Sequence, residues 1–273
     1  MNKEIISTPV INSPYQEAKR HFRFSEEGIT NEIILERRVS AYFVPIAKPK
    51  KKKSKQIGFG EIHEEWTSDR LQENKFINQV RERLDLWRRG GYKDVTRTTR
   101  RLLDYWRNPE RERRLFFCQL EALETIIYIT EVAHKYGDGW ITDHLRRSNE
   151  DANPELYRIA FKMATGSGKT VVMGMLIAWH TLNKINNRQD VRFSDAFLIV
   201  TPGITIRDRL RVLLPSDPDN YYKRMDLVPP DLINDLHQTK IVITNFHAFQ
   251  QRERVKAGKL TKSLLAQGEI SPF

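Results

Sequence analysis

The chain has 273 residues, 39% hydrophobic and 30% charged, so it can bury a substantial core beneath a polar surface. Its 46 Lys and Arg outweigh 35 Asp and Glu, and the formal net charge of +11 favours polyanionic partners, nucleic acid first. Cys118 is the single cysteine, which excludes an intrachain disulfide, and no run approaches the ~18 apolar residues of a membrane span, so we expect a cytoplasmic protein.

The first 56 residues are predicted to form a leader that ends in a lysine-rich linker. Residues 1–47 read as irregular or strand-rich, with β-prone runs at 29–35 and 40–46. Six lysines then occur within residues 48–55. Because such a run repels itself and has little to bury, we interpret it as a solvated linker and not as a dedicated phosphate-binding element.

Residues 57–150 are predicted to form a helical accessory region. Apolar residues at helical spacing predict helices over 69–89, about 95–107 and 110 to about 136. Between Arg81 and Arg114 there are twelve basic residues and six acidic ones. The aromatic residues among them could stack on bases, but at helical spacing we interpret them as core; they are Trp87, Tyr92, Tyr105 and Trp106.

From residue 151 to residue 273 strands and helices are predicted to alternate. Strands are expected at 156–162, 196–201 and 240–245, the second nearly all apolar, as in a sheet covered on both faces. Helices are expected from the first glycine turn to about residue 184, over 204–214 and near 231–237, with a loop at 215–230. This order predicts a parallel α/β sheet with right-handed crossovers.

Between the first of these strands and its helix, residues 163–170 read Met-Ala-Thr-Gly-Ser-Gly-Lys-Thr. Gly166 and Gly168 would let backbone N–H groups turn toward a triphosphate, and the following helix N-terminus adds positive potential. Lys169 would reach the β- and γ-phosphates of ATP, and the Thr170 hydroxyl would ligate Mg²⁺. We assign catalysis to Lys169 and Thr170 and nucleotide binding to the loop as a whole: Ala164, Thr165, Gly166, Ser167, Gly168, Lys169 and Thr170.

Several strings together resemble the N-terminal part of a superfamily 2 helicase-like motor, most closely the Res subunit of type III restriction enzymes. They are residues 161–170 as motif I, 198–210 as motif Ia and 241–249 as motif Ib. Met163 stands where the strict phosphate-loop pattern has glycine, and this relaxed form resembles translocating motors more than kinases. The resemblance implies an α/β P-loop NTPase fold with a RecA-like parallel sheet, ATP and Mg²⁺ as cofactors, and duplex DNA and a modification (methyltransferase) subunit as partners.

The resemblance also implies roles for residues outside the phosphate loop. The string at 115–122 resembles the segment whose glutamine reads the adenine edge, which points to Gln119, although a glutamine in an amphipathic helix is more often a surface residue. The loops after the second and third strands would hold DNA phosphates through hydroxyl, backbone N–H and basic groups. Those positions are Thr201, Pro202, Gly203, Arg207 and Asn245, although Thr201-Pro202-Gly203 alone could be an ordinary turn.

A motor of this kind needs an Asp-Glu pair after a further strand, and no such pair follows residue 170. Glu26-Glu27 and Glu64-Glu65 both precede the phosphate loop. No second motor domain or nuclease region is found, so we expect an incomplete sheet and a fragment that binds nucleotide with little hydrolysis. The alternatives are a basic nucleic-acid-binding fragment with a vestigial phosphate loop, or another P-loop NTPase such as a kinase.

Overall fold

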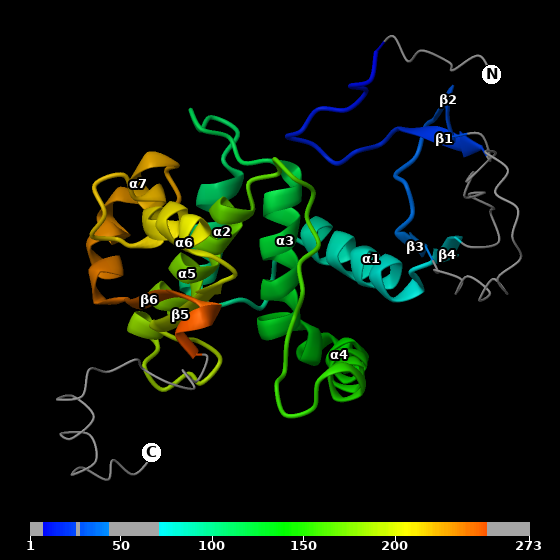
Figure 1. The fold of residues 1–273 in the computed structure, drawn as a ribbon. Helices are drawn as coiled ribbons and strands as arrows, with labels where there is room; N and C mark the ends of the chain where they lie inside the picture. The colour runs from blue at the N-terminus through cyan, green and yellow to red at the C-terminus, as the bar shows by residue number, and fades with distance from the viewer. Residues whose placement is uncertain (1–7, 26–27, 44–70, 250–273) are drawn as a thin grey trace, which may run out of the picture.

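Helix α5 (Lys169–Asn186), which follows the phosphate loop, lies at the centre of the fold. The computed structural model describes residues 8–25, 28–43 and 71–249. Apolar side chains are buried around the whole of α5, a pattern typical of a helix enclosed by other elements. It packs against α2 (Arg97–Arg107), α3 (Phe117–Ile127), α7 (Tyr221–Arg224) and the 3₁₀ segment η5 (Pro230–Gln238) (Figure 1).

The predicted helical region forms, with shifted boundaries. Helix α1 (Lys75–Arg89) starts six residues later than position 69, because the short strand β4 (Leu71–Glu73) precedes it and Asn74 caps its first turn. Helix α2 confirms the helix predicted at about 95–107. The aromatic residues of this stretch are buried or half-buried, which confirms that they belong to the core: Trp87, Tyr92, Tyr105 and Trp106.

The long helix predicted over 110–136 is wrong at its start. Helix α3 begins at Phe117, because the Arg111 side chain is buried and donates to the backbone oxygens of Tyr105 and Met225, which holds the preceding segment in a turn. After α3 the chain continues as the π-helix η2 (Tyr128–Val132) and the 3₁₀ helix η3 (Ala133–Tyr136). Gly137, at φ +76°, ends it with the left-handed cap that glycine favours.

Helix α4 (Gly139–Ala152) was not predicted. Ile141 is its only fully buried residue, and Trp140 and Leu145 pack partly against the core, so its apolar stripe is short. The predicted domain boundary near residue 150 stays a prediction, and the helices before it share one hydrophobic core with α5.

Strands β5 (Ala196–Thr201) and β6 (Lys240–Asn245) confirm two of the predicted strands and pair in parallel, with Thr201 opposite Asn245. The connection runs through α6 (Ile204–Arg209), the 3₁₀ helix η4 (Leu210–Leu213), α7 and η5, and a last 3₁₀ turn, η6 (Phe246–Phe249), follows β6. The strand predicted at 156–162 is wrong. This segment is extended and Ile159 packs on the core, but it pairs with no strand in the described part of the chain.

The β5–β6 sheet has one covered and one open face. Phe197, Ile199, Ile241 and Ile243 pack against the core. The residues that alternate with them point away from it: Leu198, Val200 and Val242 are 60%, 47% and 59% exposed. Because side chains alternate across a strand, these three form a single apolar surface.

The described part of the leader contains one antiparallel strand pair and one strand of a second pair, which β4 completes from outside the leader. Strand β1 (His21–Ser25), which was not predicted, pairs with β2 (Gly28–Ile34), and β3 (Ala41–Phe43) pairs with β4. Strand β3 lies within the β-prone run predicted at 40–46, and β2 begins one residue before the run predicted at 29–35 and ends within it. The lysine-rich segment, Glu26-Glu27 and Glu64-Glu65 lie outside the described residues. Within those residues, no helix has the length and apolar character needed to cross a membrane.

Candidate nucleotide-binding and nucleic-acid-binding sites

The phosphate loop has the backbone geometry that its two glycines predict. Gly166 and Gly168 have φ values of +79° and +78°, in the left-handed region that favours glycine. Ser167 closes the loop on itself, with its N–H and hydroxyl 3.4 and 2.7 Å from the carbonyl oxygen of Ala164. The loop is therefore a tight turn that leads into α5.

The Lys169 ammonium lies across this turn and contacts the residues that begin it. Its Nζ lies 3.0 Å from the carbonyl oxygen of Met163 and 2.8 Å from that of Ala164, and the side chain is exposed. Lys169 and Thr170 are also the first two residues of α5, so their N–H groups have no partner within the helix. A cation and free N–H donors at a helix N-terminus together form an anion-binding arrangement.

Gln119 lies directly against the phosphate loop and is not a surface residue. It is only 5% exposed, and its Nε2 donates to the carbonyl oxygen of Ser167 at 3.0 Å. Its Oε1 accepts the N–H of Phe116 at 2.9 Å, which satisfies one free donor at the start of α3. The contact is so close that a Cβ on Gly168 would come within 2.1 Å of Nε2. The structure thus brings Gln119 and the loop together, and its role toward adenine stays a prediction.

The five residues assigned to DNA lie at the carboxyl ends of β5 and β6 or on the first turn after β5. Thr201 is buried, and its hydroxyl lies 3.0 Å from the carbonyl oxygen of Gly203 and 3.3 Å from that of Thr244, so it shapes the loop from inside. The Asn245 side chain accepts the N–H of Ala248 at 3.0 Å. Parallel pairing places Thr201 and Asn245 at the same edge of the sheet.

The remaining three positions follow β5, and Gly203 among them is half-buried. Pro202 is exposed, and Arg207 projects from α6 with 41% of its side chain exposed. The Arg207 guanidinium pairs with the neighbouring Asp208 at 2.8 Å. A surface ion pair of this kind stabilises little, so Arg207 can exchange its partner for a phosphate at small cost. The DNA roles of all five residues stay predictions.

The single thiol of the chain, that of Cys118, lies near the phosphate loop, a position that was not predicted. Cys118 is exposed, and its Sγ lies 3.9 Å from the carbonyl oxygen of Ser167. Partial burial raises the pKa of this thiol, which keeps it in the weakly reactive protonated form. Its position on the first turn of α3 could not be predicted, because the start of that helix was not known from the sequence.

A glycine turn with a lysine across it, at the start of a central helix, defines a P-loop nucleotide-binding protein. A family model described as "Type III restriction enzyme, res subunit" matches residues 112–267, more than half of the chain. The chain therefore belongs to the Res subunit family of type III restriction enzymes, which confirms the resemblance seen in its motifs. Membership implies the P-loop NTPase fold and an ATP-dependent helicase-like activity of the family. Searches of curated proteins and of solved structures gave no match.

Proposed function

We propose that this chain is the ATP-binding, DNA-contacting part of a type III restriction translocase. The observation that supports it most directly is the phosphate loop, where Lys169 and the first N–H groups of α5 converge beside two left-handed glycines. When phosphates occupy this turn, the Lys169 ammonium exchanges the carbonyl oxygens of Met163 and Ala164 for phosphate oxygens. Thr170, on the first turn of α5, would supply the hydroxyl ligand for Mg²⁺, which neutralises phosphate charge when bound.

The adenine contact is assigned to Gln119. Its amide is held at the edge of the loop by Ser167 and Phe116, so the side chain is oriented before a nucleotide arrives. Burial at 5% exposure reduces the rotamer freedom that a free glutamine would lose on binding.

Duplex DNA is assigned to the edge formed by Thr201, Pro202, Gly203, Arg207 and Asn245. The support is their convergence at the ends of β5 and β6 and the net charge of +11 on the chain. Contacts of this kind position a protein on phosphates and carry no base sequence. Recognition of a specific site would then come from a modification subunit.

We further propose that the chain binds Mg·ATP without appreciable turnover. Hydrolysis by a motor of this class needs an acidic pair near the metal, and no adjacent acidic pair follows Thr170 in the sequence.

The direct test is the affinity for a fluorescent ATP analogue with Mg²⁺. Lys169→Ala should weaken binding by roughly 10- to 100-fold, because it removes a charge-assisted contact of about 1.5–3 kcal/mol. Lys162→Ala is the matched control, since it removes one exposed positive charge just before the loop. Equal affinities for wild type and Lys169→Ala would exclude the assignment.

A second candidate function is DNA binding with a vestigial phosphate loop, which the charge of +11 favours. Duplex affinity measured over a range of salt concentrations separates the two, because each neutralised phosphate steepens the salt dependence. Steep salt dependence together with no effect of Lys169→Ala on nucleotide binding would support this candidate. A third assignment, to a kinase, is disfavoured by the family match.

A further inference from the structure

The first turn of α3 is held from two opposite sides. On one side Gln119 contacts the phosphate loop. On the other side lies the leader arm, by which we mean the described residues 8–25 and 28–43. A helix turns about 100° per residue, so Phe117 and Glu121 share a face and Gln119 points roughly the opposite way. Helix α3 therefore stands between the leader arm and the nucleotide site.

The leader arm caps the start of this helix. The N–H of Phe117, which has no partner within the helix, donates to the carbonyl oxygen of Pro14 at 2.8 Å. The Tyr15 ring lies 5.7 Å from the Phe116 ring, and the Arg114 guanidinium lies over the same Tyr15 ring, 4.5 Å from its centre. These contacts fix the residues immediately before Gln119.

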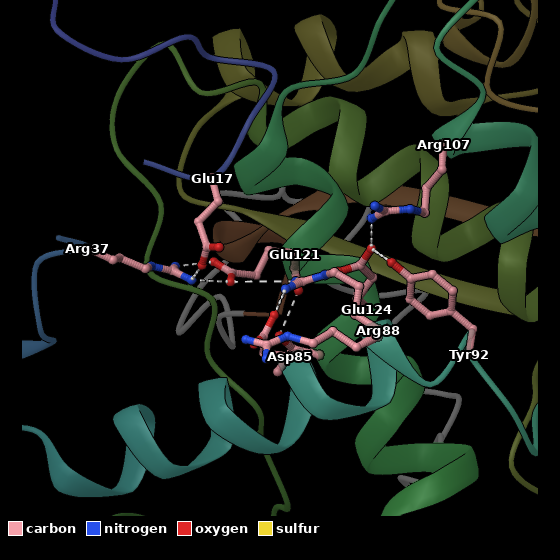
Figure 2. A network of polar contacts seen from close by, with 10 residues as sticks. Glu17, Arg37, Asp85, Arg88, Tyr92, Arg107, Glu121 and Glu124 are labelled. Atoms are coloured by element: carbon pink, nitrogen blue, oxygen red, sulfur yellow. Dashed lines mark hydrogen bonds and ion pairs between the residues drawn. The ribbon is translucent and has the colours of Figure 1, made fainter. Parts of the chain in front are cut away.

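Arg37 fastens the leader arm to α3 (Figure 2). Its Nη1 and Nη2 donate to the two carboxylate oxygens of Glu121 at 2.8 and 2.6 Å, and Nη1 also donates to Glu17 at 2.6 Å. The Arg37 and Glu121 side chains are 26% and 18% exposed. A bidentate, half-buried pair of this kind is stronger than an exposed surface pair.

The next turn of α3 is anchored by residues outside the leader arm, although Arg88 of α1 also lies 3.8 Å from Glu121. Glu124 is 1% exposed and accepts Arg88 of α1 at 2.7 Å, Tyr92 at 2.7 Å and Arg107 of α2 (Figure 2). Loss of Arg37 would therefore loosen the first turn of α3 and leave the rest of the helix in the core.

We propose that Arg37 is a positioning residue for the nucleotide site. Through Glu121, and through the cap that the leader arm places on Phe117, it keeps Gln119 seated on Ser167 of the phosphate loop. The leader arm thereby sets the affinity for nucleotide from the far side of α3. This inference rests on the proposed nucleotide binding at the phosphate loop.

The test compares Mg²⁺-dependent binding of a fluorescent ATP analogue by the whole chain and its variants. Arg37→Ala and Glu121→Ala should each weaken binding about fivefold, the lower end of typical coupling between sites. The double variant should lose less affinity than the two single losses combined, because both changes remove the Arg37–Glu121 contact. Some additional loss is expected, since Arg37 also pairs with Glu17 and Glu121 also pairs with Arg88. Arg23→Ala is the matched control and should change nothing, since among the described residues the Arg23 side chain forms an ion pair only with the exposed Glu32, at 3.1 Å.

Cys118 provides a second readout that a merely structural role would not move. It is the only thiol in the chain and lies on the first turn of α3 beside Ser167. Bound nucleotide should slow its modification by a disulfide reagent in the wild type. Arg37→Ala should speed modification without nucleotide and diminish that protection.

An unchanged nucleotide affinity in Arg37→Ala, alongside weakened binding in Lys169→Ala, would overturn this inference and leave the proposed function standing. Unchanged affinity in both variants would overturn the two together. If Arg37→Ala fails to fold, Arg37→Lys decides the matter, since it keeps the charge but loses the bidentate geometry. That variant should weaken nucleotide binding to a smaller degree, and wild-type affinity would overturn the inference.

Discussion

Two glycines of the phosphate loop share one backbone conformation but differ in their surroundings. Gly166 and Gly168 have φ values of +79° and +78°, and a Cβ on Gly166 would meet open space. A Cβ on Gly168 would collide with the Gln119 amide, which is held by Ser167 and Phe116. The cost of alanine at the two positions therefore separates backbone strain from the contact with Gln119.

We expect Gly166→Ala to lower the free energy of unfolding by about 1–2 kcal/mol, the cost of left-handed strain. Gly168→Ala should cost about 1 kcal/mol more, because the Gln119–Ser167 hydrogen bond is lost as well. Urea unfolding measures both. The double variant Gly168→Ala, Gln119→Ala should lose less free energy of unfolding than the two single variants lose in sum, because both changes remove the same hydrogen bond. Equal costs at the two glycines would contradict the observed contact.

His180, on α5, is a second residue with a measurable signature. It packs among the rings of Trp179, Phe193 and Phe197, and its Nδ1 is buried without a hydrogen-bond partner among the described residues. Burial lowers the pKa of His180 below its ordinary value of 6.5. As pH falls below about 6.5, the unfolded chain binds a proton that the folded histidine does not.

The free energy of unfolding should therefore fall with pH from about 6.5 down to the lowered pKa, by up to about 1.4 kcal/mol per pH unit from this residue. His180→Phe keeps an aromatic ring in place and removes the titrating group. Unfolding measured at pH 7.5 and 5.5 should show a smaller loss of stability in the variant than in the wild type. An identical loss in both would show that His180 titrates normally in the folded chain.

At the scale of elements, a buried carboxylate joins α2 to α5. Glu131, on η2 and 3% exposed, accepts the N–H of Thr96 on Oε2 at 2.7 Å. Its Oε1 accepts Trp179 Nε1 at 3.0 Å and the Thr99 hydroxyl at 2.6 Å. Both oxygens thus face an N–H group that can only donate.

This geometry predicts that even the isosteric Glu131→Gln destabilises the fold. If the amide NH₂ faces Thr96, that N–H loses its acceptor. If it faces Trp179, two donors meet and the indole N–H keeps only the Thr99 hydroxyl, at 2.9 Å. The expected loss is about 1–3 kcal/mol in urea unfolding. Glu150→Gln, at an exposed position of α4, is the matched control and should be neutral. A neutral Glu131→Gln would show that these contacts are not maintained in solution.

The predicted helices and strands were correct where the spacing of apolar residues along the segment determined which side chains are buried. Strands β5 and β6, helix α2 and the helix after the phosphate loop follow from apolar spacing and turn residues. The start of α3 could not be predicted, because it depends on Arg111 reaching backbone oxygens on distant segments. The segment 156–162 shows the same limit for strands, since pairing requires a neighbouring strand that apolar alternation cannot supply.

At the scale of the whole molecule, the open face of the β5–β6 sheet leaves Leu198, Val200 and Val242 outside the core. Neighbouring residues on β5 provide a test, because Leu198 is 60% exposed and Ile199 is 9% exposed. Ile199→Ala should lower the free energy of unfolding by about 2–4 kcal/mol, and Leu198→Ala by less than about 1 kcal/mol. Chemical denaturation compares the two directly. Similar losses would mean that Leu198 is covered in solution.

In the candidate site, as in the fold, local features could be predicted from the sequence and contacts between distant residues could not. The turn that leads into α5 could be predicted, because a glycine turn before an apolar helix is a local pattern. The seating of Gln119 and the clasp of Arg37 on Glu121 join positions far apart in the sequence, and no local spacing encodes them. The sequence could therefore predict the turn and its lysine, but not what holds the loop in place.

The central claim is that this chain carries a working nucleotide site built on Lys169. The most direct measurement is a calorimetric titration of Mg·ATP into the wild type and Lys169→Ala in the presence of duplex DNA, with phosphate release followed in the same sample. Saturable binding that depends on Lys169, without phosphate release, is the result predicted here. Binding that survives Lys169→Ala unchanged would contradict the claim.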